Sequence, residues 1–220
     1  MPATISPLTR LYLVLYNALS FGLWATCALR TASLILALGP DGLSGVFAHV
    51  YSPLLTTTQT LAVLEVVHSL VGIVRAPLAT TAMQVASRLL LVWGVMDPFG
   101  GRIVGAREAQ MGDYAFLGCL FAWGVTECIR YGFFVLQVSG FKVPGWWMWL
   151  RYNTFYVLYP VGIASECTLV FRALEPAAQL SPLYWWFFAV VLAVYVPGSY
   201  ILYTHMIAQR RKVMKKAKAN

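Results

Sequence analysis

Two residues whose side chains can transfer protons, Tyr159 and Glu166, stand seven positions apart in an apolar stretch of the sequence. Seven residues make about two turns of an α-helix, so the phenol and the carboxyl group share one helix face, which Tyr152 extends by another seven residues. Between the pair, Pro160 removes a backbone donor and is expected to bend the helix, and Gly162 leaves room for a ligand or another backbone. A carboxyl group and a phenol that face one gap can act as general base and general acid. The competing interpretation is that they serve helix packing.

The sequence contains no motif for a metal, a nucleotide cofactor or a covalent intermediate. Its three histidines, His49, His68 and His205, lie in separate regions, and Glu65-x-x-His68 has the spacing of a di-iron ligand pair without the second copy that such a site needs. There is no Cys-x-x-Cys pair, dinucleotide fingerprint, phosphate-binding loop or serine elbow. We therefore expect acid–base chemistry with no metal and no cofactor.

Five further polar residues interrupt the apolar runs, namely Glu65, Gln84, Arg88, Glu127 and Arg130. A charged side chain at mid-bilayer costs about 2.5–3.5 kcal/mol on insertion scales, so these groups need partners. Glu127 and Arg130 are three residues apart and are therefore neighbours on one helix. Glu65 and Arg88 lie on consecutive helices and could meet between them, with Gln84 on the face of Arg88, but the sequence does not determine which charges pair. We interpret this set as structural polar contacts between helices.

The stretches that carry these residues are predicted to be membrane-spanning helices. Of the 220 residues, 60% are hydrophobic and 11% are charged, against about 45–50% and about 25% in a soluble domain. A span needs about 20 mostly apolar residues, and six runs approximately qualify. They are Leu11–Leu36, Leu54–Val74, Leu78–Met96, Tyr114–Val138, Trp146–Phe171 and Tyr184–Ile207. The third is the weakest, because it carries Gln84 and Arg88 and follows a very short turn. The sequence thus predicts an all-α, polytopic membrane protein, a bundle of six transmembrane helices.

Positive charge is concentrated at the C-terminal end. The chain has 16 Lys and Arg against 8 Asp and Glu, and six of these cations lie in its last eleven residues. A basic flank after an apolar run indicates the cytosolic side, and with six spans both termini lie there. Lys216 and Lys218 resemble the dilysine retrieval signal of endoplasmic-reticulum membrane proteins. We expect one membrane domain over residues 1–220 with a basic tail at 208–220, a lipid bilayer around it, and no nucleic-acid partner, since the cations have no folded basic face.

The string Tyr159-Pro160-x-Gly162-x-x-x-Glu166, preceded by Arg151-Tyr152-Asn153, resembles the signature of the very-long-chain (3R)-3-hydroxyacyl-CoA dehydratases, also called the protein-tyrosine-phosphatase-like A family. The similarity extends over most of the chain, including the Glu65-x-x-His68 and Gln84-x-x-x-Arg88 stretches and the basic tail. No cysteine is followed by an arginine six residues later, so a phosphatase nucleophile loop is absent.

This resemblance implies a multi-pass enzyme of the endoplasmic-reticulum membrane that removes water from a long- or very-long-chain 3-hydroxyacyl-CoA to give the trans-2-enoyl-CoA. The reaction is the third step of fatty-acid elongation, whose products feed sphingolipids. The resemblance also implies that Tyr159 and Glu166 are the catalytic pair. The implied partners are the elongase condensing enzyme, the ketoacyl-CoA reductase and the enoyl-CoA reductase.

The chemistry of Tyr159 and Glu166 suits dehydration independently of the family resemblance. Loss of water needs a base for the proton on C2 and an acid for the hydroxyl that leaves C3. We assign Glu166 as the base and Tyr159 as the donor, although the reverse division uses the same two groups. Arg151, Tyr152 and Gly162 are candidates to support the site or bind substrate. Arg151, or Lys142 before it, could meet the phosphates of coenzyme A, and Arg151 could equally be an ion-pair partner.

Two other classes of protein remain as alternatives. A small transporter would line a polar path with buried charges, but it predicts internal symmetry, and no inverted repeat is visible. A non-catalytic scaffold of the elongation complex would share the fold, and the intact Tyr159/Glu166 pair argues against it.

Overall fold

Long helices make up most of the protein, because a helix satisfies its backbone groups internally where water is absent. The computed structural model describes residues 6–219, with side chains up to Lys215. Within that range it has helices, turns and one isolated bridge between Gly100 and Val104, but no strand. Five helical stretches are long and apolar enough to cross a membrane: Pro7–Leu38, Leu78–Phe99, Met111–Ser139, Gly145–Leu180 and Pro182–Lys215. The prediction of an all-α, polytopic membrane protein is confirmed.

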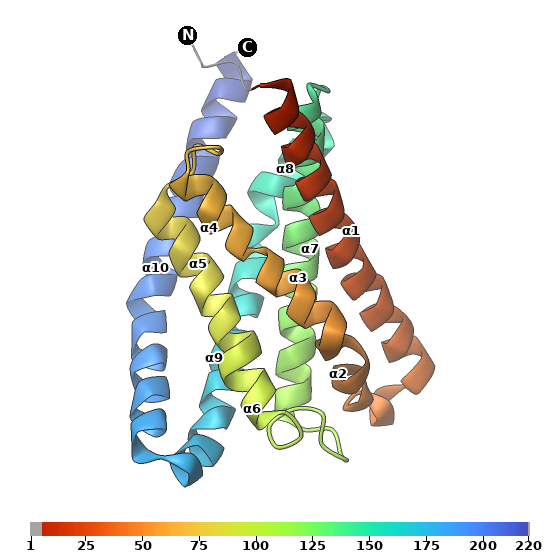
Figure 1. Cartoon of the computed structure of the whole chain (residues 1–220), viewed down its shortest axis with the longest axis vertical. Helices are drawn as coiled ribbons and strands as arrows, with labels where there is room; N and C mark the ends of the chain where they lie inside the picture. The colour runs from red at the N-terminus through yellow and green to blue at the C-terminus, as the bar shows by residue number, and fades with distance from the viewer. Residues whose placement is uncertain (1–5, 220) are drawn as a thin grey trace.

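The helical elements follow one another along the chain, and the longest connection is residues 100–110 between α6 and α7 (Figure 1). In chain order they are α1 (Pro7–Leu38), η1 (Pro40–Gly42), α2 (Gly45–Val50), η2 (Tyr51–Leu55), α3 (Thr56–Leu61), α4 (Val63–Leu70), α5 (Leu78–Leu89), η3 (Leu90–Met96), α6 (Asp97–Phe99), α7 (Met111–Ser139), α8 (Gly145–Asn153), α9 (Phe155–Leu180) and α10 (Pro182–Ala219).

The expected span Leu54–Val74 is not among the five stretches that are long and apolar enough to cross a membrane. Its pieces are short, the longest being α4 with 8 residues, and they continue a kinked segment in which Ser52 takes extended backbone angles of φ −118° and ψ 135°. The segments from α2 to α4 still return the chain to the end of the bundle where α1 begins, and α10 ends there too (Figure 1). The run expected at Leu78–Met96 forms a long helix. The count of six spans stays a prediction.

Several predicted boundaries are wrong because hydropathy marks the lipid-facing part of a helix rather than its hydrogen-bonded ends. The stretch from Arg172 to Pro182, which lies between the fifth and sixth predicted runs, is helical as far as Leu180. It holds Pro176 inside α9, where the buried Ala173 and Ala177 belong to the core. The basic stretch from residue 208 continues α10 to Ala219, as Lys and Arg are good helix formers. The proposed retrieval signal, Lys216 and Lys218, lies outside the described side chains.

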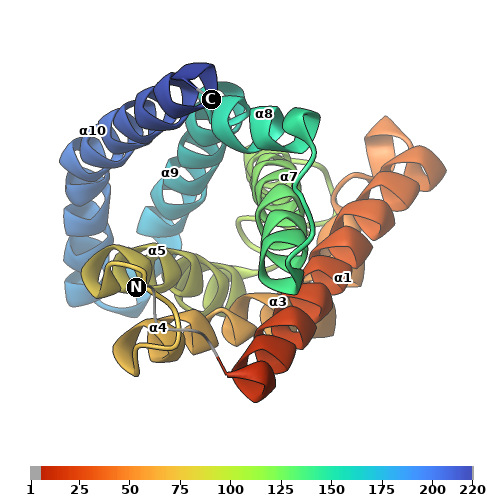
Figure 2. The ribbon, with the colours of Figure 1, turned by 90° about the horizontal axis from the view of Figure 1, so that it is seen from above.

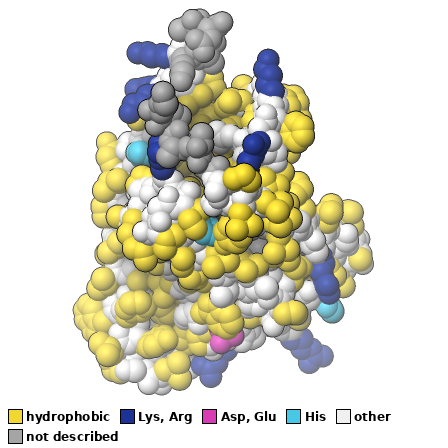
Figure 3. Space-filling view, turned by 45° about the horizontal axis from the view of Figure 1, so that its top comes forward, with side chains coloured by type: hydrophobic (Ala, Val, Ile, Leu, Met, Phe, Trp, Pro, Cys, Tyr) yellow, Lys and Arg dark blue, Asp and Glu magenta, His cyan; other side chains and the backbone are white. Residues whose placement is uncertain are grey.

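The bundle is held by a series of long contacts in which α1 packs on α7, α7 on α9, and α9 on α10 (Figure 2). The buried hydrophobic core gathers at the end opposite the start of α1. There Phe99 of α6 meets Phe188 of α10 with ring centroids 6.1 Å apart, and Phe116, Leu91 and Leu169 are fully buried. Toward the other end the packing loosens, and α8 has no buried residue. Large hydrophobic side chains cover much of the surface, with Lys and Arg toward its upper and lower margins (Figure 3).

Candidate active site

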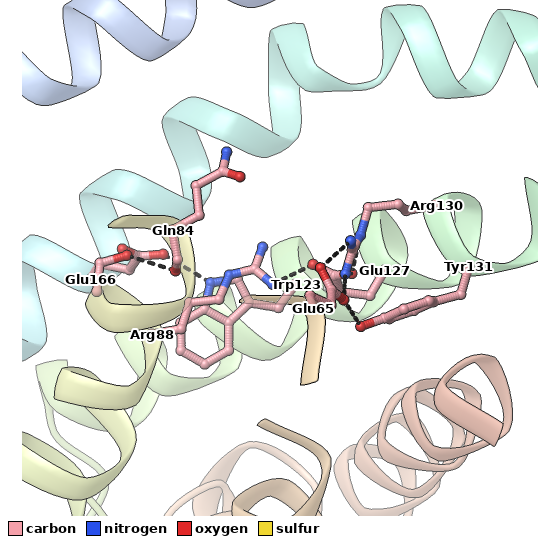
Figure 4. Close-up of polar contacts among 9 residues, drawn as sticks. Glu65, Gln84, Arg88, Trp123, Glu127, Arg130, Tyr131 and Glu166 are labelled. Carbon is pink, nitrogen blue, oxygen red and sulfur yellow. Dashed lines mark hydrogen bonds and ion pairs between the residues drawn. The ribbon is translucent and has the colours of Figure 1, made fainter. Parts of the chain in front are cut away.

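The carboxylate of Glu166 lies between two neighbouring helices, each of which donates a hydrogen bond to it. Trp123 of α7 donates from its indole Nε1 to Oε1 at 2.8 Å, and Tyr195 of α10 donates from its hydroxyl to Oε2 at 2.9 Å. Each carboxylate oxygen therefore has its own donor. Figure 4 shows the carboxylate of Glu166 with Trp123 and Arg88 at one end of a row of polar side chains.

Small residues bring α9 close enough to α7 for this contact. Gly162 is buried, and a Cβ at this position would lie 3.4 Å from the Cβ of Ala122. One turn further along α9, Ser165 occupies the space left by Gly118. The space at Gly162, which was expected to receive a ligand or another backbone, thus faces α7.

Tyr159 lies nearer the start of α9, and its contacts are with α10. Its hydroxyl donates to the backbone carbonyl of Ser199 at 3.2 Å, and its ring stacks on Tyr203 with centroids 5.6 Å apart and planes 27° from parallel. Within the described part of the chain, no hydrogen bond joins Tyr159 to Glu166 directly; the tyrosine that contacts the carboxylate is Tyr195.

The helix that carries Tyr159 is continuous through its proline. The chain passes through Pro160 as α-helix, and α8 and α9 meet at Thr154, whose backbone angles remain helical at φ −64° and ψ −23°. Tyr152 therefore belongs to α8, whereas Tyr159 belongs to α9. A proline disturbs the turn that precedes it, since its ring crowds the carbonyl four residues back, so the junction lies on the expected side of Pro160.

The other buried charges form one connected network. Glu127, almost completely buried, accepts from Arg88 and from Nε of Arg130, the latter at 2.6 Å. Arg130 also makes a two-pronged contact with Glu65, at 2.7 Å and 2.6 Å, and the hydroxyl of Tyr131 donates to Glu65. The expected contact between Glu127 and Arg130 is present. Glu65 and Arg88, which could have met between consecutive helices, each reach a different partner on α7.

Arg88 connects this network to Glu166. Its guanidinium carbon lies 5.7 Å from the ring centroid of Trp123, the residue that donates to Glu166. Gln84 is exposed one turn away on α5 and points away from the row of charges (Figure 4). A cation on the face of an indole is attracted by its π electrons, so Arg88 also fixes the plane of the Trp123 ring.

The two candidate contacts for coenzyme A differ in accessibility. Arg151 has no acidic partner in the described structure: its guanidinium carbon lies 4.3 Å and 4.7 Å from the ring centroids of Phe133 and Phe134, and its buried Nε has no hydrogen-bond partner. Lys142 is exposed in the turn between α7 and α8.

Sequence reasoning missed Trp123, Tyr195 and the carbonyl of Ser199. One signal was present, since Tyr195, Ser199 and Tyr203 follow one another at intervals of four and so share a face of an otherwise apolar helix. Trp123 stands four residues before Glu127 on α7, but nothing in a single sequence indicates that its indole meets α9.

No group of three or more metal-ligating side chains occurs among the residues that the structure describes. Glu65 and His68, whose spacing resembles that of a metal-ligand pair, contact other side chains. His68 Nε2 is 2.7 Å from the hydroxyl of Tyr12, and Glu65 accepts hydrogen bonds from Arg130 and Tyr131.

Fold and site together define a class of protein: a polytopic helical membrane protein with a carboxylate and several tyrosines between its helices. Comparison with known families makes this more specific. Residues 59–216 match the family described as "Protein tyrosine phosphatase-like protein, PTPLA". The chain belongs to this family.

Curated relatives match the chain over nearly its whole length. A protein of Schizosaccharomyces pombe named probable very-long-chain (3R)-3-hydroxyacyl-CoA dehydratase is 44% identical, over 94% of this chain and 95% of its own. The rice dehydratase PASTICCINO 2A is 39% identical, over 97% of both chains. The human very-long-chain (3R)-3-hydroxyacyl-CoA dehydratase 2 is 32% identical, over 94% of this chain and 82% of its own. No solved structure is significantly similar to the chain.

Proposed function

We propose that this protein is a very-long-chain (3R)-3-hydroxyacyl-CoA dehydratase, a hydro-lyase that forms trans-2-enoyl-CoA. The observation that carries the proposal is that relatives from a fungus, a plant and an animal, 32–44% identical over at least 94% of this chain, all have this activity in their names. The site is compatible with it, because it holds a carboxylate and phenols, which can exchange the protons that dehydration requires.

In the proposed reaction, Glu166 removes the proton from C2 of the substrate. The electrons of that C–H bond form the C2–C3 double bond, the C3–O bond breaks, and the hydroxyl leaves as water with a proton from Tyr159. Return of the proton from Glu166 to Tyr159 restores both groups, so no redox cofactor is consumed. Support comes from the placement of both residues on α9 with their polar atoms toward α10.

The proposed setting is the endoplasmic-reticulum membrane, with both termini cytosolic and with the condensing enzyme and the two reductases of fatty-acid elongation as partners. The basic end of α10 supports the orientation, because positive flanks remain on the cytosolic side. Epitope tags at either end should be cleaved by protease added to intact microsomes. Protection of either tag would contradict this topology.

The test of the activity is turnover by the purified full-length protein. A long-chain (3R)-3-hydroxyacyl-CoA is added in detergent, without nucleotide or metal, and the enoyl-CoA is followed by mass spectrometry. Glu166→Gln and Tyr159→Phe should each lower kcat by about 10²–10⁴-fold, the usual contribution of a general acid or base. Tyr200→Phe is the matched control, because Tyr200 is exposed on α10, and it should match the wild type.

Product from the wild type and from Tyr200→Phe, but little from the two site variants, would support the proposal. A folded wild type that forms no product would favour the non-catalytic scaffold. Full activity in Glu166→Gln and Tyr159→Phe would mean that other residues carry out the reaction.

A further inference from the structure

We infer that Trp123 and Tyr195 are positioning residues that together aim the carboxylate of Glu166 at its substrate. The inference rests on the proposed function, since it assigns these residues a part in the work of the base. It concerns two side chains from helices other than α9 and takes Glu166 as the base.

The geometry of the carboxylate carries the inference. Each oxygen accepts from one donor, Oε1 from the Trp123 indole at 2.8 Å and Oε2 from the Tyr195 hydroxyl at 2.9 Å. The two donors come from opposite neighbours of α9, so the carboxylate cannot rotate without breaking both contacts. A free glutamate side chain has several rotamers, and holding it in one productive orientation is a recognised source of rate.

The two donors respond differently when the carboxylate takes up a proton. An indole N–H can only donate, so the oxygen facing Trp123 remains an acceptor throughout. A tyrosine hydroxyl can donate or accept, so Tyr195 can turn its hydroxyl and accept from a protonated Glu166. The pair therefore assigns the incoming proton to Oε2 and keeps the side chain in place in both protonation states.

Both donors are themselves fixed by the fold. Trp123 is 3% exposed, and its ring lies beneath Arg88 of α5 at 5.7 Å. Tyr195 is half-buried on the face of α10 that also supplies the Ser199 carbonyl to Tyr159. The same face of α10 thus orients both members of the proposed catalytic pair.

The experiment compares Tyr195→Phe and Trp123→Phe with the wild type, measuring kcat and KM of the full-length protein across pH. Each variant keeps an aromatic ring and removes the donor. We expect kcat to fall about tenfold, as for loss of one hydrogen bond to a charged group, with KM within about twofold. Because each donor stabilises the ionised carboxylate, the acid limb of the kcat profile should move to higher pH in both variants.

Two matched controls remove the same groups elsewhere. Trp93→Phe deletes an indole N–H that donates to Thr60 at 3.1 Å, and Tyr200→Phe deletes an exposed hydroxyl on α10. Both should keep the wild-type kcat and pH profile. A lower kcat with an unmoved acid limb in Tyr195→Phe and Trp123→Phe would show that the residues act through packing alone, and unchanged kinetics would overturn the inference.

The experiments distinguish failure of the proposed function from failure of this inference. If the wild type has no turnover, or if Glu166→Gln is as active as the wild type, the assignment of Glu166 as a catalytic group falls. The contact is still measured by a thermal-unfolding double-mutant cycle of Tyr195→Phe with Glu166→Gln. Non-additive shifts in Tm would establish the contact, and additive shifts would refute it.

Discussion

At the scale of single residues, Arg130 and Arg88 differ in the number of carboxylates that they contact. Arg130 contacts two carboxylates, Glu65 and Glu127, whereas Arg88 contacts only Glu127. Removing one partner from a buried ion pair leaves an uncompensated charge, which costs about 3–5 kcal/mol. Because Arg88 and Arg130 share Glu127, loss of Arg88 still leaves that carboxylate with a cation.

We therefore expect Arg130→Met to lower the free energy of unfolding by about 3–5 kcal/mol, and Arg88→Met to lower it by less. Thermal unfolding of the detergent-solubilised variants provides the measurement. Equal losses would mean that Glu65 makes no net contribution through Arg130. Arg88→Met should also lower kcat by more than the loss of folded protein explains, because Arg88 packs on Trp123.

At the scale of elements, the close approach of α9 to α7 depends on Gly162. A Cβ there already lies at 3.4 Å from Ala122, so a leucine must push the helices apart. Overpacking of this kind costs about 1–3 kcal/mol, and it also separates the indole of Trp123 from Glu166.

Gly162→Leu should accordingly lower both Tm and turnover, and Gly162→Ala should do so only slightly. Gly198→Leu is the control in α10, because a Cβ at Gly198 meets nothing within 4 Å. If Gly162→Leu unfolds at the wild-type temperature, the α7–α9 interface is looser than the contact with Ala122 indicates.

The helices also show what one sequence can and cannot predict. Runs of apolar residues locate Leu11–Leu36 within α1 and Tyr114–Val138 within α7, since lipid demands such runs. The stretch 172–182 misleads, because buried packing around Pro176 overrides the usual effect of a proline. In the candidate site, the seven-residue interval places Tyr159 and Glu166 on one helix. The four-residue intervals of Tyr195, Ser199 and Tyr203 mark one face of α10, but the sequence does not show which helix that face meets. Trp123 could not be predicted, because contacts between helices depend on packing angles.

At the scale of the whole molecule, the uneven packing fits a substrate with two very different parts. The tight hydrophobic core lies at one end of the bundle, whereas the end where α1 begins and α10 finishes has fewer buried side chains (Figure 1). An acyl chain can lie among apolar helices, but the phosphates of coenzyme A must stay in water. The exposed turn between α7 and α8 lies at the looser end, which makes Lys142 the accessible cation of the two candidates. Arg151 lies instead against Phe133 and Phe134.

We expect Lys142→Glu to raise KM for the acyl-CoA about fivefold, the equivalent of ~1 kcal/mol for an exposed ion pair, and to leave kcat unchanged. Arg107→Glu is the charge-matched control, because Arg107 is exposed in the loop before α7, at the opposite end of the molecule. The effect of Lys142→Glu should shrink as salt is added, since screening weakens contacts between exposed charges. An unchanged KM at low salt would exclude Lys142 from coenzyme A binding, and an equal rise in Arg107→Glu would show that the overall charge of the protein, rather than a local contact, attracts the substrate.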